Sequence, residues 1–125
     1  TPNGDSFGDS ALLCTTRDMA SFARFVMNYG VWNGKRLMNE DYLKTATSKV
    51  VDNHCIAFSD SFSHGYGYQI WKCADNGFCF NGMGCQLTIC LPKKDFIFVI
   101  TSDNQGYPEA KSLIMTALYD IIIEN

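Results

Sequence analysis

Apolar residues in the first third of the chain recur with the period of an α-helix. A threonine cap at Thr15 or Thr16, with Asp18 three residues after Thr15, forms a capping-box pattern that predicts the helix start. Gly30 stands where a glycine commonly ends a helix. Between these signals, five apolar residues follow the i, i+3, i+4, i+7, i+8 spacing of a helix face that packs on a core: Met19, Phe22, Ala23, Val26 and Met27.

A tight hairpin and a second helix are predicted next. Asn33-Gly34 is a strong signal for a two-residue β-turn. Asn39 can cap a helix that we expect to end near Thr47. The connection from residue 49 to residue 64 shows no clear period, and a short strand at Cys55–Phe58 is the one element it suggests.

The second half of the chain alternates in the manner of β-strands and their turns. Asp75-Asn76-Gly77 and Pro92–Asp95 carry the residue types of hairpin turns. Phe96–Thr101 is apolar at every position up to Ile100, so we expect a central strand covered on both sides. The predicted strands are Tyr66–Cys73, Phe78–Phe80, Gln86–Leu91 and Phe96–Thr101.

A final helix is predicted to open at Pro108 and to run to the end of the chain. Its apolar stripe consists of Ala110, Leu113, Ile114, Ala117, Leu118, Ile121 and Ile122. The whole pattern predicts an α+β fold, in which an antiparallel meander is packed by a long C-terminal helix and two N-terminal helices. Residues 1–125 would then form a single domain.

Composition excludes several classes of function. The chain has 125 residues, 46% of them hydrophobic and 18% charged, which are globular values. Its net charge of −3 gives no basic footprint for nucleic acid, so we expect no nucleic-acid partner. No apolar run reaches the length of about 18 residues that a membrane span needs.

The six cysteines suggest buried thiols rather than a disulfide framework. Their even number is compatible with disulfide pairing. However, Cys79, Cys85 and Cys90 lie within apolar strand patterns, where free thiols act as small hydrophobes. Free thiols favour a cytoplasmic location for the protein. A location in the bacterial cell envelope is the alternative, if an upstream signal sequence has been removed. No Cys-x-x-Cys or His-x-x-x-His pair occurs, so we expect no metal or other cofactor.

Three segments, in this order, carry a resemblance to a known family. They are Thr15-Thr16-Arg17-Asp18-Met19-Ala20, Gly65-Tyr66-Gly67-Tyr68-Gln69-Ile70-Trp71, and Asn81-Gly82-Met83-Gly84-Cys85-Gln86. With them the chain resembles the C-terminal part of the serine beta-lactamase and penicillin-binding-protein-like hydrolases, nearest the class C-like esterase and peptidase branch. The paired glycines of the last segment could instead mark a β-bulge or a strand bend.

The resemblance implies one wall of an active site without its nucleophile. Members of the family use a Ser-x-x-Lys element, a Tyr-x-Asn element and a third element such as Lys-Thr-Gly or His-x-Gly. No lysine here has a serine three residues before it, and Cys90, the one nucleophile so placed, precedes a proline in a hairpin turn. No tyrosine precedes an asparagine by two residues. Only the third element has a counterpart, at Met83-Gly84-Cys85.

By this resemblance, the substrate-binding and oxyanion wall would consist of Gly82, Met83, Gly84, Cys85 and Gln86, with backbone amides near Cys85 and Gln86 as donors. The chain would be the C-terminal fragment of a hydrolase acting on beta-lactams, D-amino-acid peptides or small esters, and it would be inactive alone. Its partner would be the N-terminal part of the same fold. The alternative is a non-catalytic binding module that forms homo-oligomers through an exposed sheet edge or face. His54 and His64 fit loop positions better than catalytic ones.

Overall fold

The computed structural model describes residues 3–4, 10, 12–54, 62–107 and 109–123. The helices are α1 (Thr16–Met27), α2 (Glu40–Ala46), α3 (Ala110–Leu118), a short 3-10 turn η2 (Pro92–Lys94) and a π-helical turn η3 (Tyr119–Ile123). The strands are β1 (Val31–Trp32), β2 (Lys35–Arg36), β3 (Trp71–Lys72), β4 (Phe78–Gly82), β5 (Gln86–Leu91) and β6 (Phe96–Ile100). The fold is α+β, as the sequence pattern predicts.

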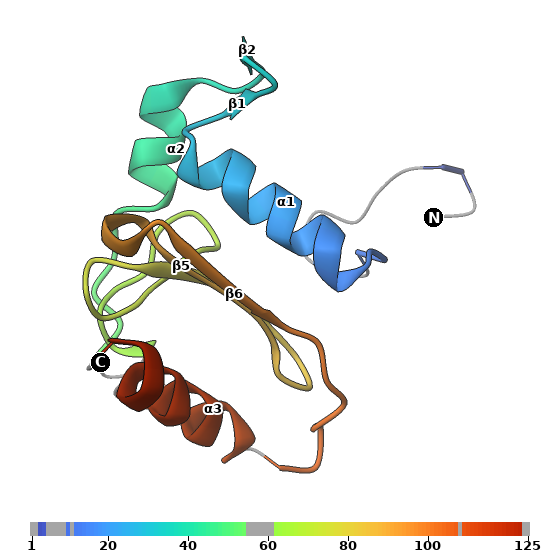
Figure 1. Ribbon diagram of the computed structural model, residues 1–125, viewed down its shortest axis with the longest axis vertical. Coiled ribbons are helices and arrows are strands. Elements are labelled where there is room, and N and C mark those ends of the chain that lie inside the picture. The colour runs from blue at the N-terminus through green and yellow to red at the C-terminus, as the bar shows by residue number, and fades with distance from the viewer. Residues whose placement is uncertain (1–2, 5–9, 11, 55–61, 108, 124–125) are drawn as a thin grey trace.

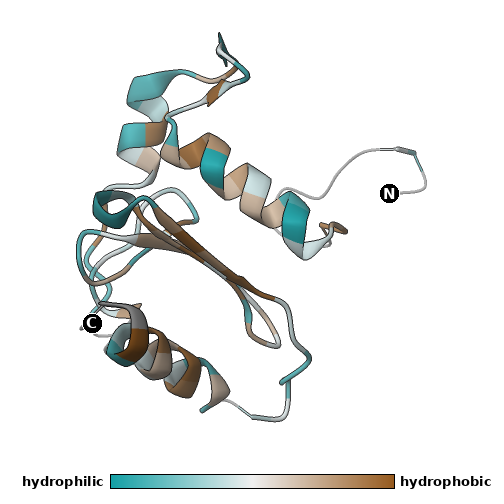
Figure 2. Cartoon of the chain, viewed as in Figure 1, coloured by the Kyte–Doolittle hydropathy of each residue, from teal (hydrophilic) through white to brown (hydrophobic). Residues whose placement is uncertain are grey.

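A four-stranded antiparallel sheet lies between two helical layers (Figure 1). Its order β3-β4-β5-β6 follows the chain, so each strand pairs with the next through a hairpin. Helix α3 covers one face, and α1 with α2 lies on the side of the other. Figure 2 shows apolar residues concentrated on the strands between α1 and α3.

The alternation of β5 divides the core into two clusters. Leu87, Ile89 and Leu91 pack with Met115 and Leu118 of α3 in the first cluster. The second cluster joins Cys90 of β5 and Phe78 of β4 with helical residues, which are Ala23, Val26, Leu43 and Ala46. Because successive side chains of a strand point to opposite faces, one strand supplies both clusters.

The predicted caps and turns are confirmed. Thr15 Oγ1 accepts from the Asp18 amide and the Asp18 carboxylate accepts from the Thr15 amide, completing the capping box. The Thr15 hydroxyl also donates to the Asp18 carboxylate at 2.7 Å, and this bond, together with the one from the Thr15 amide, holds the pKa of Asp18 below its ordinary value. Asn33 and Gly34 both have positive φ, at 49° and 76°, as their turn between β1 and β2 requires.

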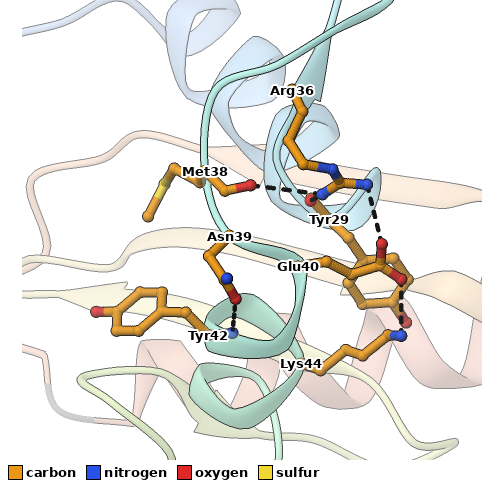
Figure 3. Close-up of polar contacts among 7 residues, drawn as sticks. All are labelled: Tyr29, Arg36, Met38, Asn39, Glu40, Tyr42 and Lys44. Atoms are coloured by element: carbon orange, nitrogen blue, oxygen red, sulfur yellow. Dashed lines mark hydrogen bonds and ion pairs between the residues drawn. The ribbon is translucent and has the colours of Figure 1, made fainter.

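Helix α2 also begins where the sequence predicts. The Asn39 side chain accepts from the Tyr42 amide at 2.9 Å, and the helix ends at Ala46, one residue before its cap. Glu40 forms ion pairs with Arg36 at 2.9 Å and with Lys44 at 2.7 Å across the first turn (Figure 3). All three side chains are exposed, so these pairs add little to stability.

Two strand predictions are wrong in part. Residues 66–70 are not a strand, because Gly67 donates to the Ile70 carbonyl and Tyr68 donates to the Ala46 carbonyl, which takes their backbone away from a ladder. Strand β6 is covered on both sides, but it is not central: among the described residues it pairs with β5 alone and forms an edge. Its residues are all half-buried, whereas those of β5 after Gln86 are buried.

The last helix changes type before its end, and the predicted stripe is only partly right: Leu118 is buried and Ile114 packs against the core. Regular α-helix stops at Leu118 and continues as a π-helical turn. Leu113 and Ile121, both predicted in the stripe, are 69% and 66% exposed, while Met115 is fully buried. The predicted strand at Cys55–Phe58 and the predicted helix start at Pro108 lie outside the described residues. No helix in the described ranges has both the length and the apolar character of a membrane crossing.

Candidate functional site: the loop between β4 and β5

The residues predicted to form an oxyanion wall lie in the hairpin loop between β4 and β5. Gly82 is opposite Gln86 at the last rung of the ladder, so Met83, Gly84 and Cys85 form the loop itself. Gly84 and Cys85 have φ of 71° and 66°. Such values are easy for glycine and unusual for cysteine, so the surrounding contacts must hold Cys85 in place.

The segment that follows β6 supplies these contacts. Ser102 Oγ donates to the Gly84 carbonyl at 2.7 Å and approaches the Cys85 carbonyl at 3.2 Å. The Asn104 amide donates to the Gly84 carbonyl at 3.2 Å, and its side chain donates to Ser102 Oγ at 3.1 Å. The Gln86 side-chain amide donates to the Ser102 carbonyl. The loop is therefore anchored through its carbonyl oxygens.

This anchoring fixes the direction of two backbone amides. In a trans peptide the C=O and N–H bonds of one plane point in opposite directions, and no described peptide bond is cis. The Gly84 carbonyl points to Ser102 and Asn104, so the N–H of Cys85 points away from them. By the same reasoning, the N–H of Gln86 points away from Ser102 and toward β4, where Gln86 pairs with Gly82. Sequence reasoning named both amides; the loop contacts orient the Cys85 N–H, and the rung with Gly82 sets the Gln86 N–H against β4.

Access to the loop is narrow. The Met83 side chain is 78% exposed, but Gly84 and Cys85 are buried. A Cβ placed on Gly84 would lie 3.4 Å from the Gln105 Cγ and 3.5 Å from the Gln86 Nε2. Two flexible glutamine side chains thus lie beside Gly84, on the side that a Cβ would occupy.

Two further features lie at or beside this loop. Thr16, at the start of α1, hydrogen-bonds through its hydroxyl to Thr101 at 3.0 Å, directly before Ser102. The Asn81 Oδ1 atom is buried and has no donor among the described residues. Because an unsatisfied buried acceptor costs about 1–3 kcal/mol, we expect its donor to come from outside the described residues.

The other candidate residues lie elsewhere. His54 Nδ1 is 3.1 Å from Asp52, and this hydrogen bond, with smaller contributions that include Lys49, lowers the pKa of Asp52 to about 2. His64 lines a pocket beside Lys72. Burial raises the pKa of Cys90 to about 12, which leaves its thiol protonated and a poor nucleophile at neutral pH.

The described cysteines are all free thiols: Cys14, which is exposed, and the buried Cys73, Cys79, Cys85 and Cys90. Within the described ranges, no three His, Cys, Asp or Glu side chains come together as a set of metal ligands.

Sequence reasoning missed the residues that support the loop. Ser102 and Asn104 belong to the polar run Thr101-Ser102-Asp103-Asn104 after β6, which could equally be an ordinary exposed turn. The one available signal is that this run follows a strand that pairs with β5, so its polar groups must come near the start of β5. The Gly65–Trp71 segment, in contrast, turns toward the end of α2.

Replacing Ser102 with alanine should loosen the loop without unfolding the domain. The change removes hydrogen bonds to two loop carbonyls, and we expect the free energy of unfolding to fall by about 1 kcal/mol. Amide hydrogen exchange should accelerate at Cys85 and Gln86. The matched variant Ser112→Ala, in α3, should leave exchange in the loop unchanged. Equal exchange in both variants would contradict the anchoring role of Ser102.

Comparison with known proteins finds solved structures with a similar fold. No family model matches the chain, and no curated protein matches it. Among 23 solved chains that match is the "Putative 6-aminohexanoate-dimer hydrolase from Bacillus anthracis". The two share 25% sequence identity with a TM-score of 0.65, over 87% of this chain and 28% of that one.

The chain has the fold of part of a hydrolase. It spans 28% of the length of that neighbour, so most of the neighbour's chain has no counterpart here. The likeness supports the fold and a hydrolase origin; the finer assignment to beta-lactamase-like chemistry is a proposal.

Proposed function

We propose that the chain is the C-terminal sheet-and-helix part of a serine hydrolase that works by acyl transfer. Its substrates would be beta-lactams, D-amino-acid peptides or small esters. The fold it shares with a protein named as a hydrolase of the 6-aminohexanoate dimer supports this proposal. The loop of residues 82–86 would contribute one wall of the oxyanion hole.

The single observation that carries the proposal is the orientation of the Cys85 amide. Ser102 and Asn104 hold the Gly84 carbonyl on one side, so the Cys85 N–H is aimed to the other side before any substrate arrives. Donors fixed in advance can stabilise the oxyanion of an acyl-transfer intermediate without reorganising during the reaction. Gln86 also starts β5, so the loop joins directly onto an internal strand of the sheet.

Because Gly84 and Cys85 are buried, an acyl group can reach the loop only if a neighbouring side chain moves. Gln86 lies over Gly84 while its side-chain amide is bonded to the Ser102 carbonyl. We infer that this side chain turns outward when the acyl group binds. Asn81 Oδ1 is buried and has no donor among the described residues, which agrees with a further segment, or a ligand, that supplies a donor beside the loop.

The chemistry itself would be divided between this chain and residues outside it. A serine on another segment of the parent protein attacks the amide or ester carbonyl, the leaving group departs, and water hydrolyses the acyl-enzyme. The sequence holds no Ser-x-x-Lys element that would supply that serine and its base, and the thiol of Cys90 is protonated at neutral pH. We therefore expect the chain to be inactive by itself.

The experiment compares the 125-residue chain with a natural polypeptide that carries the chain and its upstream residues. We expect the short chain to hydrolyse nitrocefin and p-nitrophenyl butyrate no faster than buffer. The longer polypeptide should hydrolyse at least one of them and should be labelled by a fluorophosphonate probe. Labelling should disappear when the serine of its Ser-x-x-Lys element is replaced by alanine. Full activity of the short chain would overturn the proposal.

One observation favours a second candidate, a non-catalytic module that associates through its surface. Leu113 and Ile121 at the C-terminal end leave large apolar side chains exposed. An upstream sequence without Ser-x-x-Lys, together with a stable oligomer of the short chain in sedimentation equilibrium, would favour this candidate over the hydrolase.

A further inference from the structure

A pocket lies at the end of β4 opposite the 82–86 loop. Its volume is about 430 Å³, and it is lined in part by the turn that joins β3 to β4. Small-molecule sites typically occupy 300–1,000 Å³ and combine apolar walls with a few convergent polar groups. Two lysines from separate segments, Lys49 and Lys72, line this pocket together with His64.

Lys72 is the central group. It is only 8% exposed, although lysine rarely buries so much of its surface without a partner. Its Nζ donates to the Asn76 carbonyl at 3.2 Å. An ammonium group has three donors, so two of them find no acceptor among the described residues. Desolvation lowers the pKa of Lys72, which reflects the same unfavourable burial of its charge.

The absence of a side chain at Gly65 leaves room for the Lys49 stem beside the same pocket. A Cβ on Gly65 would lie only 2.4 Å from the Lys49 Cγ and 2.8 Å from its Cδ, so the lysine stem runs across the bare glycine backbone. The Gly65 carbonyl accepts from the Lys72 backbone amide at 2.8 Å. One glycine with φ of 123° therefore holds the lysine stem on one side and the Lys72 backbone on the other.

The charges around the pocket do not cancel. Asp75 is the one acidic residue of the lining, and Lys93 also approaches it, with Nζ 3.7 Å from the carboxylate. Lys49 has a carboxylate partner in Asp52 at 3.4 Å, but Asp52 lies outside the lining. Lys72 has no such partner in the described part of the chain. The lining as a whole therefore favours an anion carrying about one charge.

We propose that this pocket binds a small organic monocarboxylate, held by the ammonium groups of Lys72 and Lys49. The carboxylate would accept the two free donors of Lys72, and Lys49 would add a second, more exposed cation at the rim. The lysine stems, Cys73 and Ala74 offer an apolar wall to a short alkyl chain. This site goes beyond the proposed hydrolase function and does not depend on it.

The test is a titration of the 125-residue chain with sodium butyrate, followed by two-dimensional amide NMR at constant ionic strength. Butyramide, of the same shape but uncharged, is the reference ligand. We expect saturable butyrate shifts at Gly65 and at residues 72–76, with a dissociation constant in the millimolar range. Butyramide should produce no saturable shift there. Equal responses to the two ligands, or none to butyrate, would overturn the proposal.

Variants locate the binding group. Lys72→Met keeps the stem, removes a buried charge and should weaken butyrate binding about tenfold or more. Lys49→Met should weaken it several-fold, and Lys35→Met, on the exposed β2, should leave it unchanged. Unaltered binding by Lys72→Met, or saturable binding of inorganic phosphate without butyrate, would also overturn the proposal. Should Lys72→Met not fold, the butyrate and butyramide titrations of the wild type and of Lys49→Met still decide.

Discussion

Replacing Gly67 with alanine should lower the free energy of unfolding by about 3 kcal/mol or more. An added Cβ would lie 2.0 Å from the Ala46 carbonyl oxygen and 2.8 Å from that of Ser48. These are backbone atoms at the end of α2, so no rotamer change can relieve the contact. The chain must instead separate the 66–70 turn from α2. Urea denaturation followed by far-UV circular dichroism measures the loss.

Gly106→Ala is the matched control. Nothing lies within 4 Å of the Cβ that it would carry, and its φ is not in the left-handed region. We expect a change within about 0.5 kcal/mol. A small and similar effect of the two substitutions would mean that the packing of Gly67 against α2 does not occur in solution. The expected signature of Gly67→Ala is a lower denaturation midpoint with weaker protection of the Tyr68 amide, which donates to Ala46.

This contact also explains why the sequence misled the prediction for residues 66–70. Their aromatic side chains favour a strand, and the local pattern holds no sign of α2. The decisive partner is the Ala46 carbonyl, some twenty residues earlier in the chain. The isolated bridges of Tyr66 with Val51 and with Trp71 show how much strand character remains. A tertiary contact outweighed the intrinsic preference.

Local signals were the reliable ones. The Thr15 and Asn39 caps, the Asn33-Gly34 turn and the hairpin at Asp75–Gly77 depend on groups within a few residues of one another, and all are confirmed. The boundaries of β5 were predicted to the residue, because its alternation is bounded by turn signals. The exposure of Leu113 and the edge position of β6 depend on what packs nearby, which one sequence does not contain.

The candidate sites likewise contain residues that the sequence could point to and residues that only the fold reveals. The loop of residues 82–86 stands out in the sequence because its glycines mark an unusual backbone. Ser102 could not be assigned to it from sequence, since its hydroxyl reaches carbonyls 17 and 18 residues away. Lys72 lies in a predicted strand, where a lysine usually faces solvent. Only the fold shows that it is buried against a pocket.

Replacing Leu91 with alanine should destabilise the domain by about 3 kcal/mol. Leu91 is fully buried at the end of β5 and belongs to the cluster that packs against α3. A Cβ on Gly77 would lie 2.8 Å from the Leu91 Cδ2, so the side chain also fills the space against the β3–β4 turn. Alanine removes the apolar contact and leaves a cavity between sheet and turn. Thermal and urea denaturation should both report the loss.

The matched control for Leu91 is Leu37→Ala, because Leu37 is 56% exposed after β2 and loses little buried surface. We expect its effect to stay within about 0.5 kcal/mol. The same variant also reports on the candidate site, because Leu91 lies at one end of β5 and the 82–86 loop lies at the other end. If β5 folds as one unit, Leu91→Ala should accelerate amide exchange at both ends. Acceleration confined to residues 89–91 would contradict a single cooperative sheet.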